Sequence, residues 1–274
     1  MKLEICVEDL AGVAAALEGG ADRIELCSAL ALGGVTPSTQ LLVAALDLCR
    51  PKQVPVHVMV RPRAGDFDYD ESDLKLALSE GEALVDAGAD GLMFGATRDG
   101  GLDLAGLRRW VERFRGQTTR SFSALELSLH RAIDTLDDLV AAVDEAVGLG
   151  FGRILSSGGA SNAAVGAPTL ARMVERAGGR CRIAAGAGIV PGNVRQIIAA
   201  SRVDEVHSSA STVVGTEARL VSLGFAGETR KITAASLVRA LKDETIQGPD
   251  VTSCERNTPN LSTRDGSGDE SISQ

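Results

Sequence analysis

The stretch Glu-Gly-Gly-Ala-Asp-Arg-Ile at 18–24 has two counterparts, Asp-Ala-Gly-Ala-Asp-Gly-Leu at 86–92 and Gly-Leu-Gly-Phe-Gly-Arg-Ile at 148–154. In each, a glycine follows an amphipathic helical pattern, and a short turn leads into an apolar run. Glycine often ends a helix because it adopts the left-handed backbone conformation without a steric penalty. The three stretches predict repeated units in which a helix is followed directly by a strand.

Apolar runs alternate with helical patterns along most of the chain. The predicted strands are 2–7, 23–27, 54–61, 91–95, 124–130, 153–157, 182–186 and 204–208. The predicted helices are 10–18, 37–48, 71–86, 104–115, 136–147, 169–177 and 191–200. Such alternation is typical of a parallel sheet in an α/β fold. Eight strands, and no G-x-G-x-x-G after the first, favour a TIM-type (β/α)8 barrel over an open doubly wound sheet.

The composition predicts a single domain followed by a polar tail. A chain of 274 residues with 44% hydrophobic and 24% charged residues can bury one large core. We assign residues 1–245 to the barrel, with a closing helix at 232–242. Residues 246–274 are rich in Ser, Thr, Gly, Asn and charged groups, and this composition predicts disorder.

Charge and cysteine content argue against a nucleic-acid-binding, membrane-bound or disulfide-stabilised protein. A formal net charge of -9 argues against a nucleic-acid or anionic-membrane partner, and the basic residues of 108–115 are interpreted as a solvated helix face. No run is long and apolar enough to span a bilayer, and the chain begins directly with a strand. The five cysteines form no C-x-x-C motif, so structural disulfides are not expected. These features predict a cytoplasmic protein.

Polar and sulfur-containing side chains recur at one strand parity, which places them on the inside of a barrel. Those at the carboxyl ends of strands are Cys6, Cys27, Arg61, His130 and His207. The carboxyl ends of barrel strands form the functional face, so these residues are predicted to meet in one site. Glu4 and His57 lie deeper, where hydrogen bonding within the core is an equally good interpretation.

Cys6 and Cys27 end the first two strands, which are neighbours about 5 Å apart in a barrel. Soft thiolates suit Cu(I), and Met59 at the same parity adds a thioether. Two alternatives stay open. Cysteine is also a good small core residue, and a redox pair is the other interpretation, disfavoured because no base lies nearby in the sequence.

The loop after the third strand carries Arg61 and Arg63, whose guanidinium groups suit a carboxylate or phosphate ligand. In the alternative interpretation, the two arginines form ion pairs with Asp66, Asp68 or Glu25 and so hold the loop at the mouth in shape. Glycine-rich turns at 156–159 and 186–188 lead toward helices, whose free N–H groups bind anions. These turns weakly favour an anion subsite.

The fifth strand ends in His130-Arg-Ala-Ile-Asp134, which offers an imidazole, a guanidinium and a carboxylate within one turn. His130 is a candidate acid or base, with Asp134 or Glu25 fixing its tautomer and His207 directed into the same mouth. The predicted catalytic candidates are therefore Glu25, His130 and His207. The predicted ligand-binding residues are Arg61, Arg63, Arg131 and Asp134.

Several dense motifs resemble the CutC copper-homeostasis family. They are Gly-Gly-Ala-Asp-Arg-Ile-Glu-Leu-Cys at 19–27, Gly-Gly-Val-Thr-Pro-Ser at 33–38, Val-His-Val-Met-Val-Arg-Pro-Arg-Ala-Gly-Asp-Phe at 56–67, His-Arg-Ala-Ile-Asp at 130–134 and Glu-Val-His-Ser-Ser at 205–209. The resemblance runs from the first residue to the eighth strand. It implies a cytosolic TIM-type barrel, commonly a homo-oligomer, that is linked to copper tolerance and binds Cu(I) through Cys6 and Cys27.

The same resemblance leaves an enzyme open as the alternative. The family's mouth, with residues matching Glu25, Arg61, His130 and Arg131, looks like that of a lyase, isomerase or hydrolase. In that interpretation Arg61 and Arg131 bind an acidic small molecule, and His130 with Glu25 or His207 transfers a proton. The chain departs from the family pattern at Ile133, which replaces Phe, and at residues 64 and 187, where Ala replaces Gly.

Overall fold

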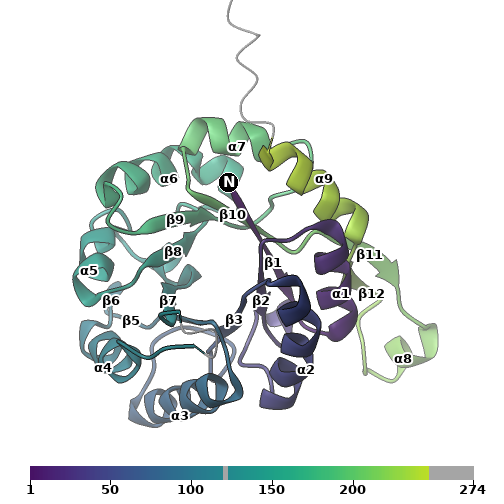
Figure 1. Cartoon of the computed structure of the whole chain (residues 1–274), viewed down its shortest axis with the longest axis horizontal. Coiled ribbons are helices and arrows are strands. Elements are labelled where there is room, and N and C mark those ends of the chain that lie inside the picture. Colours follow the sequence, from purple (N-terminus) through teal and green to yellow (C-terminus); the bar gives the residue numbers. More distant parts are fainter. Residues whose placement is uncertain (120–122, 247–274) are drawn as a thin grey trace, which may run out of the picture.

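Eight parallel strands close into a barrel in the computed structural model, which describes residues 1–119 and 123–246 (Figure 1). The strands are β1 Lys2–Val7, β2 Arg23–Leu26, β3 Val56–Met59, β4 Gly91–Phe94, β7 Glu126–Leu129, β8 Arg153–Ser156, β9 Arg182–Ala185 and β10 Glu205–Ser208. Consecutive barrel strands pair with one another, and β10 closes the ring by pairing with β1. The predicted TIM-type (β/α)8 barrel is confirmed.

Helices surround the barrel as an outer ring (Figure 1). They are α1 Leu10–Gly19, α2 Thr39–Cys49, α3 Glu71–Ala87, α4 Leu104–Phe114, α5 Ala142–Leu149, α6 Ala163–Ala177, α7 Val194–Ser201 and α9 Ala235–Ile246. The glycines of the three repeated stretches end helices as the sequence predicts. Gly20, Gly88 and Gly150 cap α1, α3 and α5 with φ of 89°, 106° and 108°, the left-handed conformation that suits glycine.

Two predicted helices have different limits in the structure. The segment predicted as helix 136–147 begins with a 3-10 helix, η3 Arg131–Thr135, and α5 starts only at Ala142. The helix predicted at 169–177 begins six residues earlier, at Ala163. There the Asn162 side chain accepts a hydrogen bond from Val165 N at 3.0 Å, and this cap starts the helix ahead of Pro168.

An arm between β10 and α9 is absent from the sequence prediction. It consists of the antiparallel strands β11 Ser211–Gly215 and β12 Thr229–Thr233, joined through the short helix α8 Ala218–Ser222. Figure 1 shows the arm projecting from the side of the barrel next to α1. A smaller hairpin, β5 Thr97–Arg98 with β6 Gly101–Leu102, follows β4. The arm strands are exposed at most positions and the strands of the smaller hairpin are very short, so neither carries a burial pattern that could be recognised.

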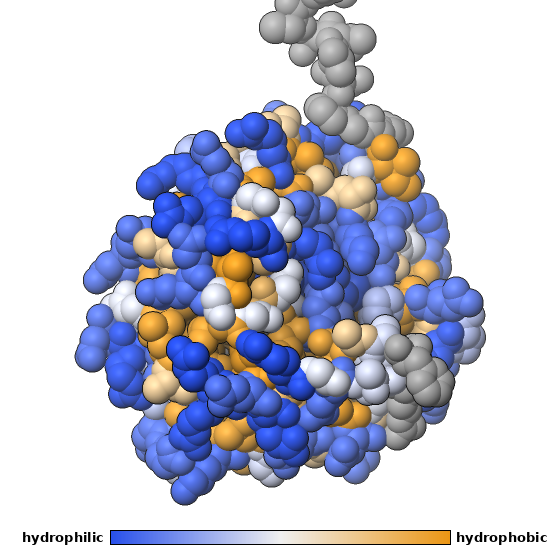
Figure 2. Space-filling view, turned by 60° about the vertical axis from the view of Figure 1, so that its left-hand side comes forward, coloured by the Kyte–Doolittle hydropathy of each residue, from blue (hydrophilic) through white to orange (hydrophobic). Residues whose placement is uncertain are grey.

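The main apolar core fills the space between strands and helices, and a small second cluster lies inside the barrel. The inner cluster comprises Cys27, Met59, Met93, Leu155 and Ala184. On the outside, hydrophilic residues cover much of the face in Figure 2, and hydrophobic ones show mainly near its centre. Over the described residues, no helix combines the length and apolar character needed to cross a membrane. The predicted tail from 247 onward lies outside the described residues.

Candidate functional site

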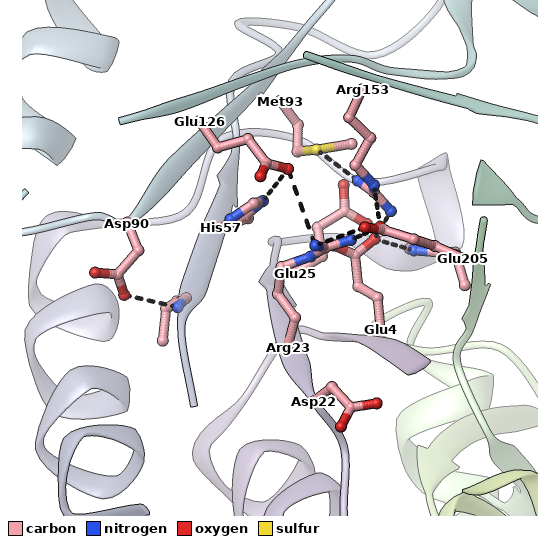
Figure 3. A network of polar contacts seen from close by, with 12 residues as sticks. Glu4, Asp22, Arg23, Glu25, His57, Asp90, Met93, Glu126, Arg153 and Glu205 are labelled. Atoms are coloured by element: carbon pink, nitrogen blue, oxygen red, sulfur yellow. Dashed lines mark hydrogen bonds and ion pairs between the residues drawn. The ribbon is translucent and has the colours of Figure 1, made fainter. Parts of the chain in front are cut away.

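Four charged side chains form a buried ionic network inside the barrel (Figure 3). Arg23 donates from Nε to Glu4 at 2.5 Å and also pairs with Glu205. Arg153 donates to Glu4 at 2.6 Å and to Glu205 at 2.7 Å. Two carboxylates and two guanidinium groups therefore compensate one another where water is excluded, which is how proteins accommodate buried charge.

The network keeps its carboxylates ionised. Burial alone would raise the pKa of Glu4, but the charges of Arg153 and Arg23 lower it well below its ordinary value. Burial would likewise raise the pKa of Glu205, and the hydrogen bond from Arg23 with the charge of Arg153 lowers it. Neither arginine is among the residues predicted from the sequence. Arg23 nevertheless precedes Glu25 by two residues and shares its inward parity, a signal that identifies it.

His207 contacts this network through Glu4. Its Nδ1 lies 2.7 Å from Glu4 Oε1, and its Nε2 lies 3.5 Å from Glu25 Oε2. Burial alone would lower the pKa of His207, but Cys6, Glu25 and the hydrogen bond with Glu4 together raise it well above its ordinary value. Glu4 therefore orients the imidazole and favours its charged form.

Cys6 and Glu25 complete a compact group with His207. The ligand atoms of the three buried residues lie within 4.8 Å of one another, so they can hold a metal ion. Burial, then the nearby charge of Glu4, raises the pKa of Glu25, and its Oε1 has no hydrogen-bond partner. Cys6 is paired in register with Glu25, so Cys27, two residues after Glu25 and just beyond the end of β2, lies next to this group on the side of the mouth.

Cys27 belongs to the sulfur-rich cluster inside the barrel, where it packs with Met59 and Met93. Its side chain is 1% exposed, and burial with the charge of Glu25 raises the pKa of its thiol well above the ordinary value. A neutral thiol is therefore the resting form. Binding a metal there requires the thiol to lose its proton.

Arg61 lies on the cavity wall and is 5% exposed. Its Nη1 donates to the carbonyl oxygens of Leu32 and Gly34 at 2.9 and 3.1 Å, and its Nη2 donates to that of Gly65 at 2.6 Å. Its guanidinium carbon lies 4.8 Å from the centre of the Phe67 ring. These partners are neutral, so the charge of Arg61 is held in place without being compensated.

Arg63, two residues later, lies outside the cavity lining. It donates to Asp73 at 2.7 Å and to Asp66 at 2.9 Å, and its side chain is 37% exposed. Hydrogen bonds with Asp73 and Asp66 raise the pKa of Arg63. The structure thus separates the two arginines. Arg61 faces the cavity, whereas Arg63 holds the loop in shape.

His130 also lines the cavity, with its ring 5.1 Å from that of Phe67. Burial, then the charge of Arg61, lowers its pKa to about 3, so the imidazole is neutral. Its Nδ1 accepts from Ala132 N at 3.2 Å, which leaves the proton on Nε2. The backbone, rather than the expected Asp134 or Glu25, fixes the tautomer, and His130 offers a free Nε2–H donor at neutral pH.

Asp134 fills the glycine-rich turn after β8. It accepts from Ser156 Oγ at 2.5 Å, from Ser157 N at 2.9 Å and from Gly159 N at 3.3 Å. Arg131 donates to the same carboxylate at 2.7 Å. A side chain of the protein itself therefore takes the anion position that the sequence suggested for a ligand, and it also neutralises Arg131.

The turn after β9 contains Ala187, one of the two alanines found where the sequence resemblance predicts glycine. Ala187 has φ of 74°, in the left-handed region where a Cβ is unfavourable, and its carbonyl accepts from Ala163 N at 3.0 Å. That contact with the start of α6 holds the turn in this conformation. Ala64 is not among the residues with positive φ, so its methyl group introduces no such strain.

The cavity at the barrel mouth has a volume of about 680 Å³. It gathers most of the predicted residues, namely Cys6, Glu25, Cys27, Arg61, His130, Arg131, Asp134 and His207. Lys231 of the arm also lines it, a contribution that sequence reasoning missed because the arm itself was not predicted. Residues from β1, β2, β3, β10 and the turns beyond β7 thus meet in one space, as expected for a barrel.

Comparison with known proteins identifies the family. The CutC family profile matches residues 1–212. The chain belongs to the CutC family. A family protein CutC of Agrobacterium fabrum is 44% identical over 245 residues, covering 88% of this chain and 93% of the relative. One of Rhizobium meliloti is 42% identical over 244 residues, covering 88% and 95%.

Solved structures agree with this assignment. A CutC from Streptococcus agalactiae, described as a candidate copper homeostasis protein, is 28% identical with a TM-score of 0.70. The alignment covers 76% of this chain and 98% of that one. Thiamine phosphate pyrophosphorylase from Pyrococcus furiosus is 16% identical with a TM-score of 0.55. The alignment covers 90% of this chain and 96% of that one, and the likeness shows the fold alone.

Proposed function

We propose that this CutC protein acts in copper homeostasis and binds Cu(I) through Cys6 and Cys27. The observation that carries the proposal is the buried group of soft donors on the inner side of the cavity. Both thiols line the cavity, and the Met59 thioether packs beside Cys27. Cu(I) prefers such soft ligands, and copper is here the cargo rather than a resident cofactor.

The surroundings of the two thiols fit this role. His207 is the nearest nitrogen donor, and its ligand atom lies within 4.8 Å of that of Cys6. Glu25 supplies negative charge next to an entering cation. Reduced thiols and Cu(I) both require a reducing compartment, so the proposal includes a cytoplasmic location.

An anaerobic Cu(I) titration against a competing chelator tests the proposal. The Cys6→Ser/Cys27→Ser variant is expected to bind at least about 100-fold more weakly, because losing a ligand costs more than the ~10–100-fold of a lost second-layer contact. Cys49→Ser/Cys181→Ser is the matched control, since both of these cysteines are buried but lie in the outer core. Equal affinity in the two double variants would refute the cysteine site.

The size of the cavity supports an enzyme as a second candidate function. A volume of about 680 Å³ is in the range of small-molecule sites and far exceeds a single ion. Glu25 and His207 would transfer the proton. The pKa values of both groups are raised, so each holds a proton more tightly than a free side chain and is suited to act as an acid. Small-molecule binding that survives Cys6→Ser/Cys27→Ser would separate this candidate from copper binding.

We also propose that two copies of the chain associate through the arm. The arm exposes four large apolar side chains, Val213, Leu220, Leu223 and Phe225, at 61%, 41%, 59% and 78%. A two-stranded hairpin is marginally stable alone in water, so contact with a second arm would stabilise it.

Light scattering coupled to size-exclusion chromatography tests this association. The wild type is expected at a multiple of 28.4 kDa, and Leu223→Ser/Phe225→Ser at 28.4 kDa. Val165→Ser is the control, because Val165 is 66% exposed on α6, away from the arm. A monomeric wild type, or an unchanged mass in the arm variant, would contradict the proposal.

A further inference from the structure

One corner of the cavity holds a positive charge with no negative partner. Among the described residues, no carboxylate lies within ion-pair distance of Arg61, and the hydrogen bonds of Nη1 and Nη2 end on backbone carbonyls. Its Nε–H has no acceptor. A buried guanidinium without a counter-charge is unfavourable, because desolvation is not offset. The corner would therefore be stabilised by an anion.

A second unsatisfied donor lies in the same corner. His130 Nε2 carries the ring proton, because Nδ1 accepts from Ala132 N, and it has no partner. Its side chain is 2% exposed. Both His130 and Arg61 contact the Phe67 ring, at 5.1 and 4.8 Å, so the two donors are neighbours. A buried donor without an acceptor is costly, and few occur in native proteins without a functional reason.

The other cationic groups of the mouth are already paired or, in the case of Lys231, exposed to solvent. Arg131 is paired with Asp134, and Asp134 takes the free N–H groups of the turn after β8. Arg63 is paired with Asp73 and Asp66 away from the cavity. Buried charge and free hydrogen-bonding capacity for a ligand are thus concentrated at Arg61 and His130.

We propose that Arg61 and His130 form a subsite for the carboxylate group of a small organic ligand. One guanidinium and one imidazole N–H match the single charge and two oxygens of a carboxylate, whereas a phosphate dianion would leave a charge uncompensated. The apolar part of the ligand lies against Leu30, Met59 and Leu155, which line the same cavity. Its far end then points toward Cys6 and His207.

This subsite does not depend on copper binding, although both share the cavity. Arg61 and His130 are not members of the Cys6, Glu25 and His207 group. Substituting Arg61 is therefore expected to leave Cu(I) affinity unchanged. Loss of the proposed Cu(I) site would therefore leave the carboxylate subsite untouched, and the absence of the carboxylate subsite would leave Cu(I) binding untouched.

Calorimetric titration of the full chain with benzoate tests the subsite, with benzamide as the neutral analogue and phenyl phosphate as the dianion. Benzoate is expected to bind at least about 10-fold more tightly than either, since a charge-assisted hydrogen bond is roughly twice as strong as a neutral one. Arg61→Met is expected to weaken benzoate binding by about 10–100-fold. Arg63→Met, two residues away in the same loop, is the matched control and is expected to bind like the wild type.

His130→Asn provides a second variant in case Arg61→Met does not fold. Asparagine retains an acceptor near the position of Nδ1 for Ala132 N but has no group at the position of Nε2. Its benzoate affinity is expected to fall about 10-fold. No measurable benzoate binding, equal binding of benzamide, tighter binding of phenyl phosphate, or unchanged affinity in the folded variants would each overturn the assignment.

Discussion

Replacing Arg153 with methionine is expected to lower the free energy of unfolding by about 3–5 kcal/mol, the usual cost of removing one partner from a buried ion pair. Arg153 is fully buried and donates to both Glu4 and Glu205. Methionine fills much of the same space, so the loss is mainly electrostatic. Glu4 would keep Arg23 and His207, and Glu205 would keep Arg23 and the part-exposed Arg182, but each buried carboxylate would lose one short ion pair.

Urea unfolding at neutral pH measures this loss, with Arg113→Met as the matched control. Arg113 also forms an arginine–carboxylate pair, with Glu82 at 2.5 Å, but both side chains are nearly half exposed. Its substitution is expected to cost about 0–1 kcal/mol, because water already solvates the two charges. A cost for Arg153→Met that is no larger than that of the control would mean that the network does not stabilise the barrel.

The fold was predictable because its signals are local and repeated. Each barrel strand is short and carries apolar residues at its outward-facing positions, and Gly20, Gly88 and Gly150 mark helix ends wherever the repeated stretch occurs. The arm lacks both signals. Its strands are exposed on most positions, so no burial pattern distinguishes them from a loop.

The contents of the site were predictable, but the roles of its residues were not. Strand parity and position bring Cys6, Cys27 and Arg61 into one cavity, as a barrel requires. Roles depend on contacts between residues far apart in the sequence. The carboxylate of Asp134 is taken by a turn more than twenty residues later, and Arg63 differs from Arg61 only in its neighbours. Neither fact has a periodic signal.

Acidification is expected to destabilise the protein well before its ion-paired carboxylates titrate. Burial, then Arg61, lowers the pKa of His130 from 6.5 to about 3, and burial, then Arg23, lowers the pKa of His57 well below 6.5. Below pH 6.5 the unfolded chain therefore binds two protons that the folded chain excludes. The free energy of unfolding falls by about 1.4 kcal/mol per pH unit for each histidine.

His207 does not offset this loss. Its folded pKa is raised, so its contribution is complete below 6.5 and disappears only as the pH rises through the folded value. Glu4 and Glu205 have lowered pKa values, so their contributions begin to fall only near and below 4.5. Glu25, Glu80 and Asp90 have raised pKa values, so the folded chain takes up protons there first and gains stability as the pH falls toward 4.5. The loss between pH 6.5 and 4.5 comes from His57 and His130, and these three carboxyl groups reduce the net slope.

Urea unfolding of wild type and His130→Asn at pH 6.5 and pH 4.5, the limits of this window, isolates one of the two contributions. Asparagine does not titrate, so the variant is expected to lose stability more gently, by about 1.4 kcal/mol less per pH unit. Parallel pH profiles would mean that His130 is solvated or charged in the folded protein. In that case it would also not be the neutral Nε2–H donor that the carboxylate subsite requires, so this slope tests the protonation state on which the subsite depends.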